Sequence, residues 1–113
     1  MLKSNVGYSI NPDSFTAGIE TAKLTSKNLN NIKLGLLFTS VKNDIKEVIK
    51  GIRKETDIPI IGCTSSGGII VQEGIIESKD GFAGMMMLSD ENLKFKFDGL
   101  IDFSHNPNIY QFE

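Results

Sequence analysis

The order of apolar and polar residues along this chain predicts alternating strands and helices over its first half. Residues 6–10 alternate between large apolar and small side chains, which is typical of a short half-buried strand. Asn11 is expected to cap a helix at residues 12–27, with Pro12 at its first position, where a missing N–H costs nothing. The apolar face expected for this helix comprises Phe15, Ile19 and Ala22.

A second strand and a second helix follow with clearer patterns. Residues 33–39 form a continuous apolar run, which predicts a central strand that is covered on both faces. Residues 43–55 place apolar side chains at helical spacing, with charged residues on the opposite side. The apolar positions of this helix are Ile45, Val48, Ile49 and Ile52. Residues 57–62 predict a third strand, and Pro59 belongs at its start or at a sheet edge.

The second half of the chain has the pattern of strands. Small residues at 63–68 predict a loop, and an irregular tail is predicted for 98–113. The strands predicted between them are 69–71 and 74–76, which flank a turn, then 82–88 and 93–97. Met86 should point to the opposite face from its two neighbours. The prediction is an α/β fold with a mixed sheet: a β-α-β-α-β start whose strands pair in parallel, followed by antiparallel strands.

Composition and charge narrow the functional classes. The chain has 113 residues, 40% of them apolar, which suits one globular domain over residues 1–113. With 12 Lys and Arg residues and 14 Asp and Glu residues the net charge is −2, so a nucleic acid partner is not expected. No apolar run approaches the roughly 20 residues of a membrane-spanning helix, and no secretory signal is visible. We therefore expect a cytoplasmic protein without membrane insertion.

Cys63 is the single cysteine and His105 the single histidine, which limits metal and thiol chemistry. One cysteine makes no intramolecular disulfide, and these two side chains would need two carboxylates to complete a zinc site. A catalytic Cys63 would need a base and a setting that lowers its pKa, and the spacing indicates neither. His105 could ligate haem iron, but a lone histidine in an irregular tail is more simply a solvated residue. We expect no cofactor and no enzymatic activity.

The small residues after the third strand form the first candidate site. They are Cys63, Thr64, Ser65, Ser66 and Gly67. A strand that ends in such a loop can direct backbone N–H groups and hydroxyls toward a phosphate or the carboxylate of an amino acid. Ligands of α/β sheets bind at the carboxyl ends of parallel strands. The alternative is a tight turn whose hydroxyls satisfy its own backbone.

Asn11 and Asp13 form the second candidate site, at the end of the first strand. Ordinary helix capping explains both residues. They would also contact a ligand if the first strand ended beside residues 63–67 in the sheet. The adjacency of these two segments is therefore the most informative structural observation.

Two motifs give the chain a family resemblance. Residues 7–13 have the sequence Gly-Tyr-Ser-Ile-Asn-Pro-Asp, and residues 62–68 have the sequence Gly-Cys-Thr-Ser-Ser-Gly-Gly after an apolar strand. In order and spacing they resemble the N-terminal half of a FIST domain (F-box and intracellular signal transduction), over about residues 5–97. FIST regions are longer, so the resemblance implies that residues 1–113 are the N-terminal portion of a larger sensory region.

The resemblance implies a cytoplasmic input domain that binds a small molecule, with amino acids as the usual suggestion. Such a domain would signal to a downstream domain such as a histidine kinase or a chemoreceptor region. Some members have been linked to haem, and the family supplies no catalytic residue for this chain. The alternative is a structural or protein-interaction domain without its own ligand. It would form a homodimer or pair with a second half through residues 93–97 or 82–88.

Overall fold

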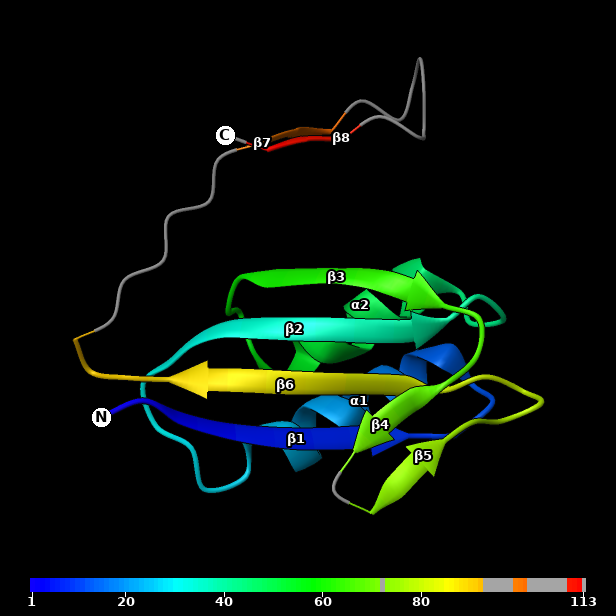
Figure 1. Ribbon diagram of the computed structural model, residues 1–113, viewed down its shortest axis with the longest axis horizontal. Helices are drawn as coiled ribbons and strands as arrows, with labels where there is room; N and C mark the ends of the chain where they lie inside the picture. Colours follow the sequence, from blue (N-terminus) through cyan, green and yellow to red (C-terminus); the bar gives the residue numbers. More distant parts are fainter. Residues whose placement is uncertain (72, 93–98, 102–109, 113) are drawn as a thin grey trace.

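The computed structural model describes residues 1–71, 73–92, 99–101 and 110–112, and its main body is a β-sheet with two helices (Figure 1). In chain order the elements are β1 (Lys3–Ser9), α1 (Ser14–Ser26), β2 (Ile32–Ser40), α2 (Ile45–Glu55), β3 (Ile60–Ser65), β4 (Ile69–Val71), β5 (Gly74–Ile76), β6 (Ala83–Ser89), β7 (Gly99–Ile101) and β8 (Tyr110–Phe112). The predicted α/β fold with a mixed sheet is confirmed.

β6 lies in the interior of the sheet, between β1 and β2 (Figure 1). The strand order is β1-β6-β2-β3, with β6 antiparallel to both neighbours and β2 parallel to β3. The prediction that the first three strands pair in parallel is correct for β2 with β3 and wrong for β1. The physical reason is burial. β6 supplies Ala83, Met85 and Met87 to the core, whereas β1 begins with exposed polar residues that suit an edge.

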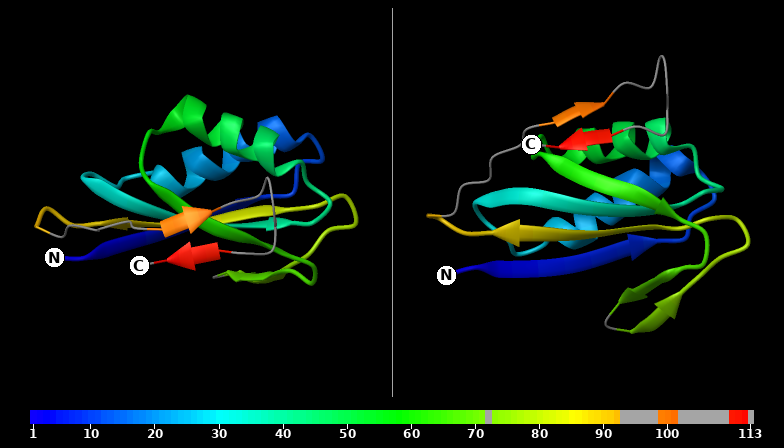
Figure 2. Two further views of the ribbon diagram at one scale, coloured as in Figure 1. Left: turned by 90° about the horizontal axis from the view of Figure 1, so that it is seen from above. Right: turned by 45° about the horizontal axis from the view of Figure 1, so that its top comes forward.

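Both helices pack on the same face of the sheet (Figure 2). The core beneath them contains Ala17, Ala22, Leu37, Val48, Ile52, Ala83, Met85 and Met87. β2 is interior in the sheet, as predicted, but it is not covered on both faces, because Phe38 on the other face is 41% exposed. The predicted alternation around Met86 is confirmed, since both its neighbours are buried and Met86 is 37% exposed.

α1 begins at Ser14, two residues later than predicted. Asp13, and not Asn11, is the N-cap: its carboxylate accepts a hydrogen bond from the Thr16 N–H at 2.9 Å. The side-chain oxygen of Asn11 instead accepts from the Asp13 N–H, also at 2.9 Å. These contacts form a turn ahead of the helix and leave Pro12 outside it.

The face of α1 that packs on the sheet is made of small residues, and the predicted apolar face is wrong. The buried residues of α1 are Ala17, Gly18, Thr21, Ala22 and Thr25. Of the predicted face only Ala22 is buried, while Phe15 and Ile19 are half-buried. Small side chains are needed because α1 lies very close to β1: a Cβ on Gly7 would stand 2.7 Å from the Thr25 backbone nitrogen.

α2 begins two residues later than predicted and ends where predicted, and its apolar face is confirmed in part. It begins after Asp44, whose carboxylate accepts hydrogen bonds from two backbone N–H groups of the first turn. Val48 and Ile52 are buried, as their helical spacing predicts, whereas Ile45 and Ile49 of the predicted apolar face are 36% and 38% exposed. Pro59 stands immediately before β3, and β3 is an outer strand of the sheet, so both positions expected for this proline are confirmed.

β4 and β5 form the predicted hairpin, which lies on the face of the sheet opposite the helices (Figures 1 and 2). Ile69 of β4 packs over Gly84 of β6, where any Cβ would collide with the isoleucine side chain. The irregular tail prediction is wrong in part, because β7 and β8 pair antiparallel. The strand predicted at 93–97 lies outside the described residues.

Candidate functional site

The carboxyl ends of β1, β2 and β3 lie at one edge of the sheet, because these strands run in the same direction. Both helices begin at this edge, which is on the right in Figure 1, where the three arrows end. In α/β sheets this is the edge at which ligands bind. Both groups of predicted site residues belong to it, one after β1 and the other at the end of β3.

Ser9, Asn11 and Glu20 form a hydrogen-bonded cluster at the end of β1. The Ser9 hydroxyl donates to Glu20 Oε1 at 3.2 Å, and the Asn11 side-chain nitrogen donates to the same oxygen at 3.0 Å. The Asn11 backbone N–H donates to the Ser9 hydroxyl oxygen at 3.1 Å. Ser9 is buried, and Glu20 reaches the cluster from the second turn of α1. These contacts fix the orientation of the Glu20 carboxylate.

An open depression of about 710 Å³ lies over this cluster. Its walls come from the end of β1, the turn after it, α1 and the tip of the β4–β5 hairpin. The lining residues are Tyr8, Ser9, Ile10, Asn11, Pro12, Glu20, Leu24 and Glu73. Of these described residues two are carboxylates and none is Lys or Arg, so the depression favours a ligand with a positive group.

Asp13 serves the helix rather than the depression. Its carboxylate accepts from the Thr16 hydroxyl at 2.5 Å and from the Thr16 backbone N–H, and these two hydrogen bonds hold the pKa of Asp13 below its ordinary value. Asp13 is not among the residues that line the depression. Capping therefore accounts for its side chain.

The first half of the loop predicted after the third strand, residues 63–65, is strand. β3 continues to Ser65, so Cys63 and Thr64 are exposed residues of an outer strand. The Ser65 hydroxyl donates to the Gly68 carbonyl at 3.0 Å, as the turn interpretation expects. Gly67 is open: apart from its chain neighbours, no atom of the described residues lies within 4 Å of the place where its Cβ would stand.

The structure does not bring the two predicted segments together. β1 and β3 are the two outer strands of the four-stranded sheet, and three spacings of roughly 4.8 Å put their axes about 14 Å apart. Asn11 lines the depression, whereas none of residues 63–67 does, and Ser66 lies with Gly67 in an exposed bend. The two segments are not adjacent in the sheet, so the condition for a shared site is not met. A free amino acid, whose amino and carboxylate groups lie within about 3 Å of each other, would contact one segment or the other.

Glu20 and Glu73 are site residues that the sequence analysis missed. Glu20 carried a signal, because it stands seven residues after Asp13 and so lies two helical turns beyond the cap on the same side of α1. Glu73 carried none, because only the tertiary placement of the hairpin brings it to the end of β1.

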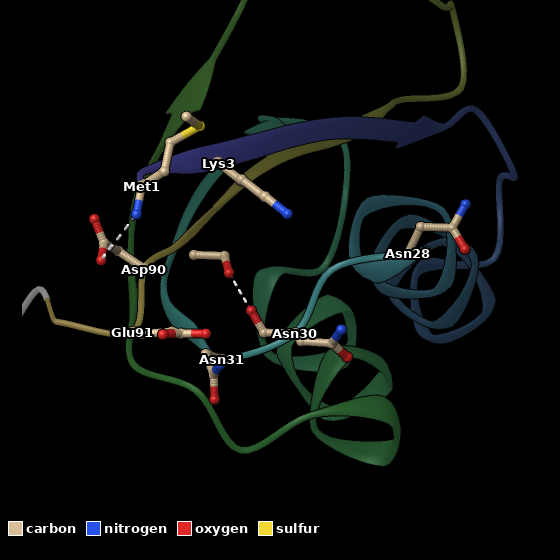
Figure 3. Close-up of a pocket in the computed structure, with 8 residues that line it drawn as sticks. Met1, Lys3, Asn28, Asn30, Asn31, Asp90 and Glu91 are labelled. Carbon is tan, nitrogen blue, oxygen red and sulfur yellow. Dashed lines mark hydrogen bonds and ion pairs between the residues drawn. The ribbon is translucent and has the colours of Figure 1, made fainter.

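A second pocket, of about 360 Å³, lies at the opposite end of the sheet (Figure 3). Its lining residues are Met1, Lys3, Asn28, Asn30, Asn31, Ser89, Asp90 and Glu91. The amino-terminal nitrogen lies 3.8 Å from Asp90 Oδ1, and the Ser89 hydroxyl donates to the Asn30 carbonyl. Asn28 and Asn31 have φ angles of 62° and 55°, a backbone conformation that favours asparagine in turns. Pairing and turn formation thus account for many of its polar groups.

Within the part of the chain that the structure describes, no group of three His, Cys, Asp or Glu side chains is placed to hold a metal ion. None of the helices described is long and apolar enough to cross a membrane. His105, which was considered for haem, lies outside the described residues.

Comparison with known proteins identifies the family. A search of the curated proteins found no match. The FIST N domain model matches residues 33–104, which is more than half of the chain. The match includes the motif at residues 62–68 and begins after the one at residues 7–13. The chain therefore belongs to the FIST family, whose domains serve as sensors in signal transduction.

Proposed function

We propose that this protein is a sensory input domain that binds a small molecule with an amino group, such as an amino acid, in the depression at the end of β1. Membership of the FIST family supports the sensory role. The ligand assignment is carried by the Glu20 carboxylate, whose Oε1 accepts hydrogen bonds from Ser9 and Asn11 within an acidic depression.

The chemistry of the Glu20 carboxylate suits an ammonium group. Both hydrogen bonds from the described residues reach Oε1, so with respect to these residues Oε2 remains an acceptor. An ammonium group brings three donors and a positive charge, and charge-assisted hydrogen bonds are about twice as strong as neutral ones. Ser9 and Asn11 orient the carboxylate before a ligand arrives, which reduces the entropy lost on binding. The hydroxyl of Tyr8, in the wall of the depression, offers a donor for a ligand carboxylate.

The bend after β3 is a second candidate, for an anionic ligand group. Ser66 and Gly67 are exposed there, and the backbone of Gly67 is unobstructed. Backbone N–H groups in such turns bind carboxylates and phosphates. Residues Cys63, Thr64 and Ser65 would flank a ligand held at this bend. Because one amino acid does not bridge the two candidates, they predict different mutational effects.

Thermal unfolding measured against a panel of free amino acids tests the proposal. A ligand at 100 times its Kd adds about 2.7 kcal/mol to the free energy of unfolding and so raises the Tm. Glu20→Gln should abolish the shift, while Glu77→Gln, at an exposed position that does not line the depression, should leave it intact. A shift that survives Glu20→Gln and is lost in Gly67→Asp would move the ligand to the β3 bend. No shift with any amino acid would contradict the ligand assignment.

We further propose that the domain acts in the cytoplasm, as the N-terminal portion of a larger sensory region, and passes its signal to a domain such as a histidine kinase or a chemoreceptor region. The FIST match supports a signalling role of this kind. The test is to join the chain to a histidine kinase core and measure autophosphorylation. A rate that responds to the stabilising amino acid is expected, and a rate that ignores it would contradict the proposal.

An interaction domain without its own ligand is the alternative, and one face of the sheet favours it. Val6, Met86 and Ile61 belong to one cross-strand row on the face opposite the helices, and they are 38%, 37% and 44% exposed. Exposed apolar patches mark interaction surfaces. A homodimer in light scattering that Met86→Lys converts to a monomer would favour this alternative. A wild-type monomer at every concentration would argue against self-association.

A further inference from the structure

The outer edge of β1 has the features of a strand that can accept a further strand. Among the described strands β1 pairs only with β6, so that its other edge has no described partner. On an outer strand every second residue turns both its N–H and its C=O away from the sheet. The seven residues of β1 therefore offer three or four such positions.

Two depressions adjoin along this edge. One is the depression at the end of β1, and the other, of about 520 Å³, lies beside the start of the strand. They share Leu24 and Glu73, and together they include every β1 residue from Ser4 to Ser9 except Gly7. The result is one groove, with β1 along its floor, α1 as one wall and the hairpin tip as the other.

The α1 wall of this groove carries an ordered set of side chains. Glu20 and Leu24 of α1 and Lys27, the residue that caps the end of the helix, follow one another at intervals of four and three residues and so form a stripe along the groove. Leu24 lies beside the middle of β1, since its Cβ is 2.9 Å from the position that a Cβ on Gly7 would take. Lys27 lies toward the start of β1, where its carbonyl accepts from the Asn5 side chain at 3.3 Å.

Along its α1 side the groove is thus acidic at one end, apolar in the centre and basic at the other end, while Glu73 of the hairpin tip faces both halves. Glu20 marks the carboxyl end of β1, through its hydrogen bond with Ser9. Leu24 is 51% exposed, so it offers an apolar surface to whatever enters. Lys27 is exposed at the opposite end.

We propose that this groove binds an extended peptide, which adds to the sheet as a strand antiparallel to β1 and presents basic, apolar and acidic side chains at alternate positions. Added strands gain affinity from backbone pairing and specificity from alternate side chains. The helix rises about 10.5 Å from Glu20 to Lys27, and strand residues four apart span about 13 Å. Charges four residues apart therefore reach both ends of the stripe.

The direction of the peptide follows from the antiparallel pairing, which is the stronger form. Its N-terminal half lies at the Glu20 end, so the order along the peptide is basic, apolar, acidic. This inference goes beyond the proposed amino acid ligand and shares only the Glu20 end of the groove with it. A free amino acid does not need Leu24 or Lys27. The amino acid proposal and the peptide proposal can therefore be contradicted independently of each other.

Fluorescence anisotropy with a labelled, acetylated and amidated heptapeptide, Thr-Lys-Thr-Val-Thr-Glu-Thr, tests the proposal on the full chain. We expect saturable binding. Methylation of the backbone nitrogens at alternate residues removes donors without changing side chains. One of the two alternate sets should weaken binding by about tenfold or more, and the other set, which points away from β1, should change it little.

A charge exchange tests the predicted order. Lys27→Glu should weaken binding of this peptide by about two- to fivefold, as expected for an exposed ion pair. Replacing the glutamate of the peptide by lysine should restore binding to the variant. Lys54→Glu, at an exposed position on α2, is the matched control and should have no effect. Circular dichroism confirms that each variant is folded.

Three results would overturn the proposal. The first is the absence of binding at millimolar peptide, and the second is equal binding of both methylated sets, which would exclude backbone pairing. The third is a concentration-dependent dimer that the peptide displaces, because a second copy of the chain would then be the natural occupant of the edge.

Discussion

Gly18 of α1 and Gly51 of α2 stand face to face where the two helices cross: an ideal Cβ on Gly51 would lie 3.1 Å from the Gly18 Cα. A Cβ on Gly18 would lie 2.9 Å from the carbonyl carbon of Val48. These neighbours are backbone atoms, which cannot rotate away as side chains do. The crossing therefore sets the distance at which both helices cover the sheet.

Gly51→Ala should lower the free energy of unfolding by about 1–3 kcal/mol, the usual cost of overpacking. This loss would outweigh the roughly 0.5–1 kcal/mol that alanine gains over glycine within a helix. Urea denaturation measures the difference. Gly67→Ala is the control, because its Cβ would meet no atom within 4 Å. A neutral Gly51→Ala would show that the helices do not cross so closely.

The alternation in β6 predicts unequal effects at neighbouring methionines. Met87→Ala should cost about 2–5 kcal/mol of unfolding free energy, since the side chain is fully buried and its loss leaves a cavity. Met86→Ala, on the partly exposed face, should cost less than about 1 kcal/mol. Equal losses in the same urea titrations would mean that the open face of the sheet is covered in solution.

Asp13 should make α1 sensitive to acid. Hydrogen bonds from Thr16 depress the pKa of folded Asp13. The carboxylate therefore contributes its full stabilisation above the pKa that Asp13 has in the unfolded chain, about 4. This stabilisation is lost as the pH falls toward the lower pKa that Asp13 has in the folded protein. Asp13→Asn, which keeps a capping oxygen, should flatten the fall of Tm below about pH 4. Asp57→Asn, at an exposed position, is the control. An unaltered acid profile in Asp13→Asn would refute the assignment.

Thr39→Val should leave the protein equally stable or make it more stable, by up to roughly 1 kcal/mol. Thr39 is fully buried, and its hydroxyl has no hydrogen-bond partner among the described residues. Valine has the same shape without the unpaired hydroxyl. Ser9→Ala is the contrasting variant, because Ser9 donates to Glu20 and accepts from Asn11, and it should cost about 1 kcal/mol. A destabilised Thr39→Val would indicate that the hydroxyl is paired, for instance to a buried water.

Local patterns predicted most of the elements, because the forces that select them act within a few residues. The spacing of Val48 and Ile52 identifies α2, and the apolar run at residues 82–88 identifies β6. The order of the strands in the sheet could not be predicted from local patterns. It depends on which strand would lose the most burial of its apolar side chains in an outer position. The apolar face of α1 was predicted wrongly for a similar reason. The tight crossing at Gly18 requires small residues on the buried face, whereas the helical periodicity favoured Phe15.

The candidate site was predicted only in part. Asn11 was found because turn and capping residues are recognisable from sequence. Its hydrogen bond with Glu20 depends on the angle between β1 and α1, which no local pattern encodes. Contact between residues 63–67 and Asn11 depends on the third strand lying beside the first, and local patterns do not encode the order of strands. Both β6 and β2 lie between β1 and β3, so this condition is not met.

The position of β6 also has a consequence during synthesis on the ribosome. β2 ends at Ser40 and β6 begins at Ala83, so 42 residues lie between these two partners. At about 5–20 residues per second, translation takes roughly 2–9 seconds to bridge that gap. Throughout that interval the nascent chain holds β1 and β2 without the strand that joins them. The arrival of β6 is therefore the event that turns two separate halves into one cooperative unit.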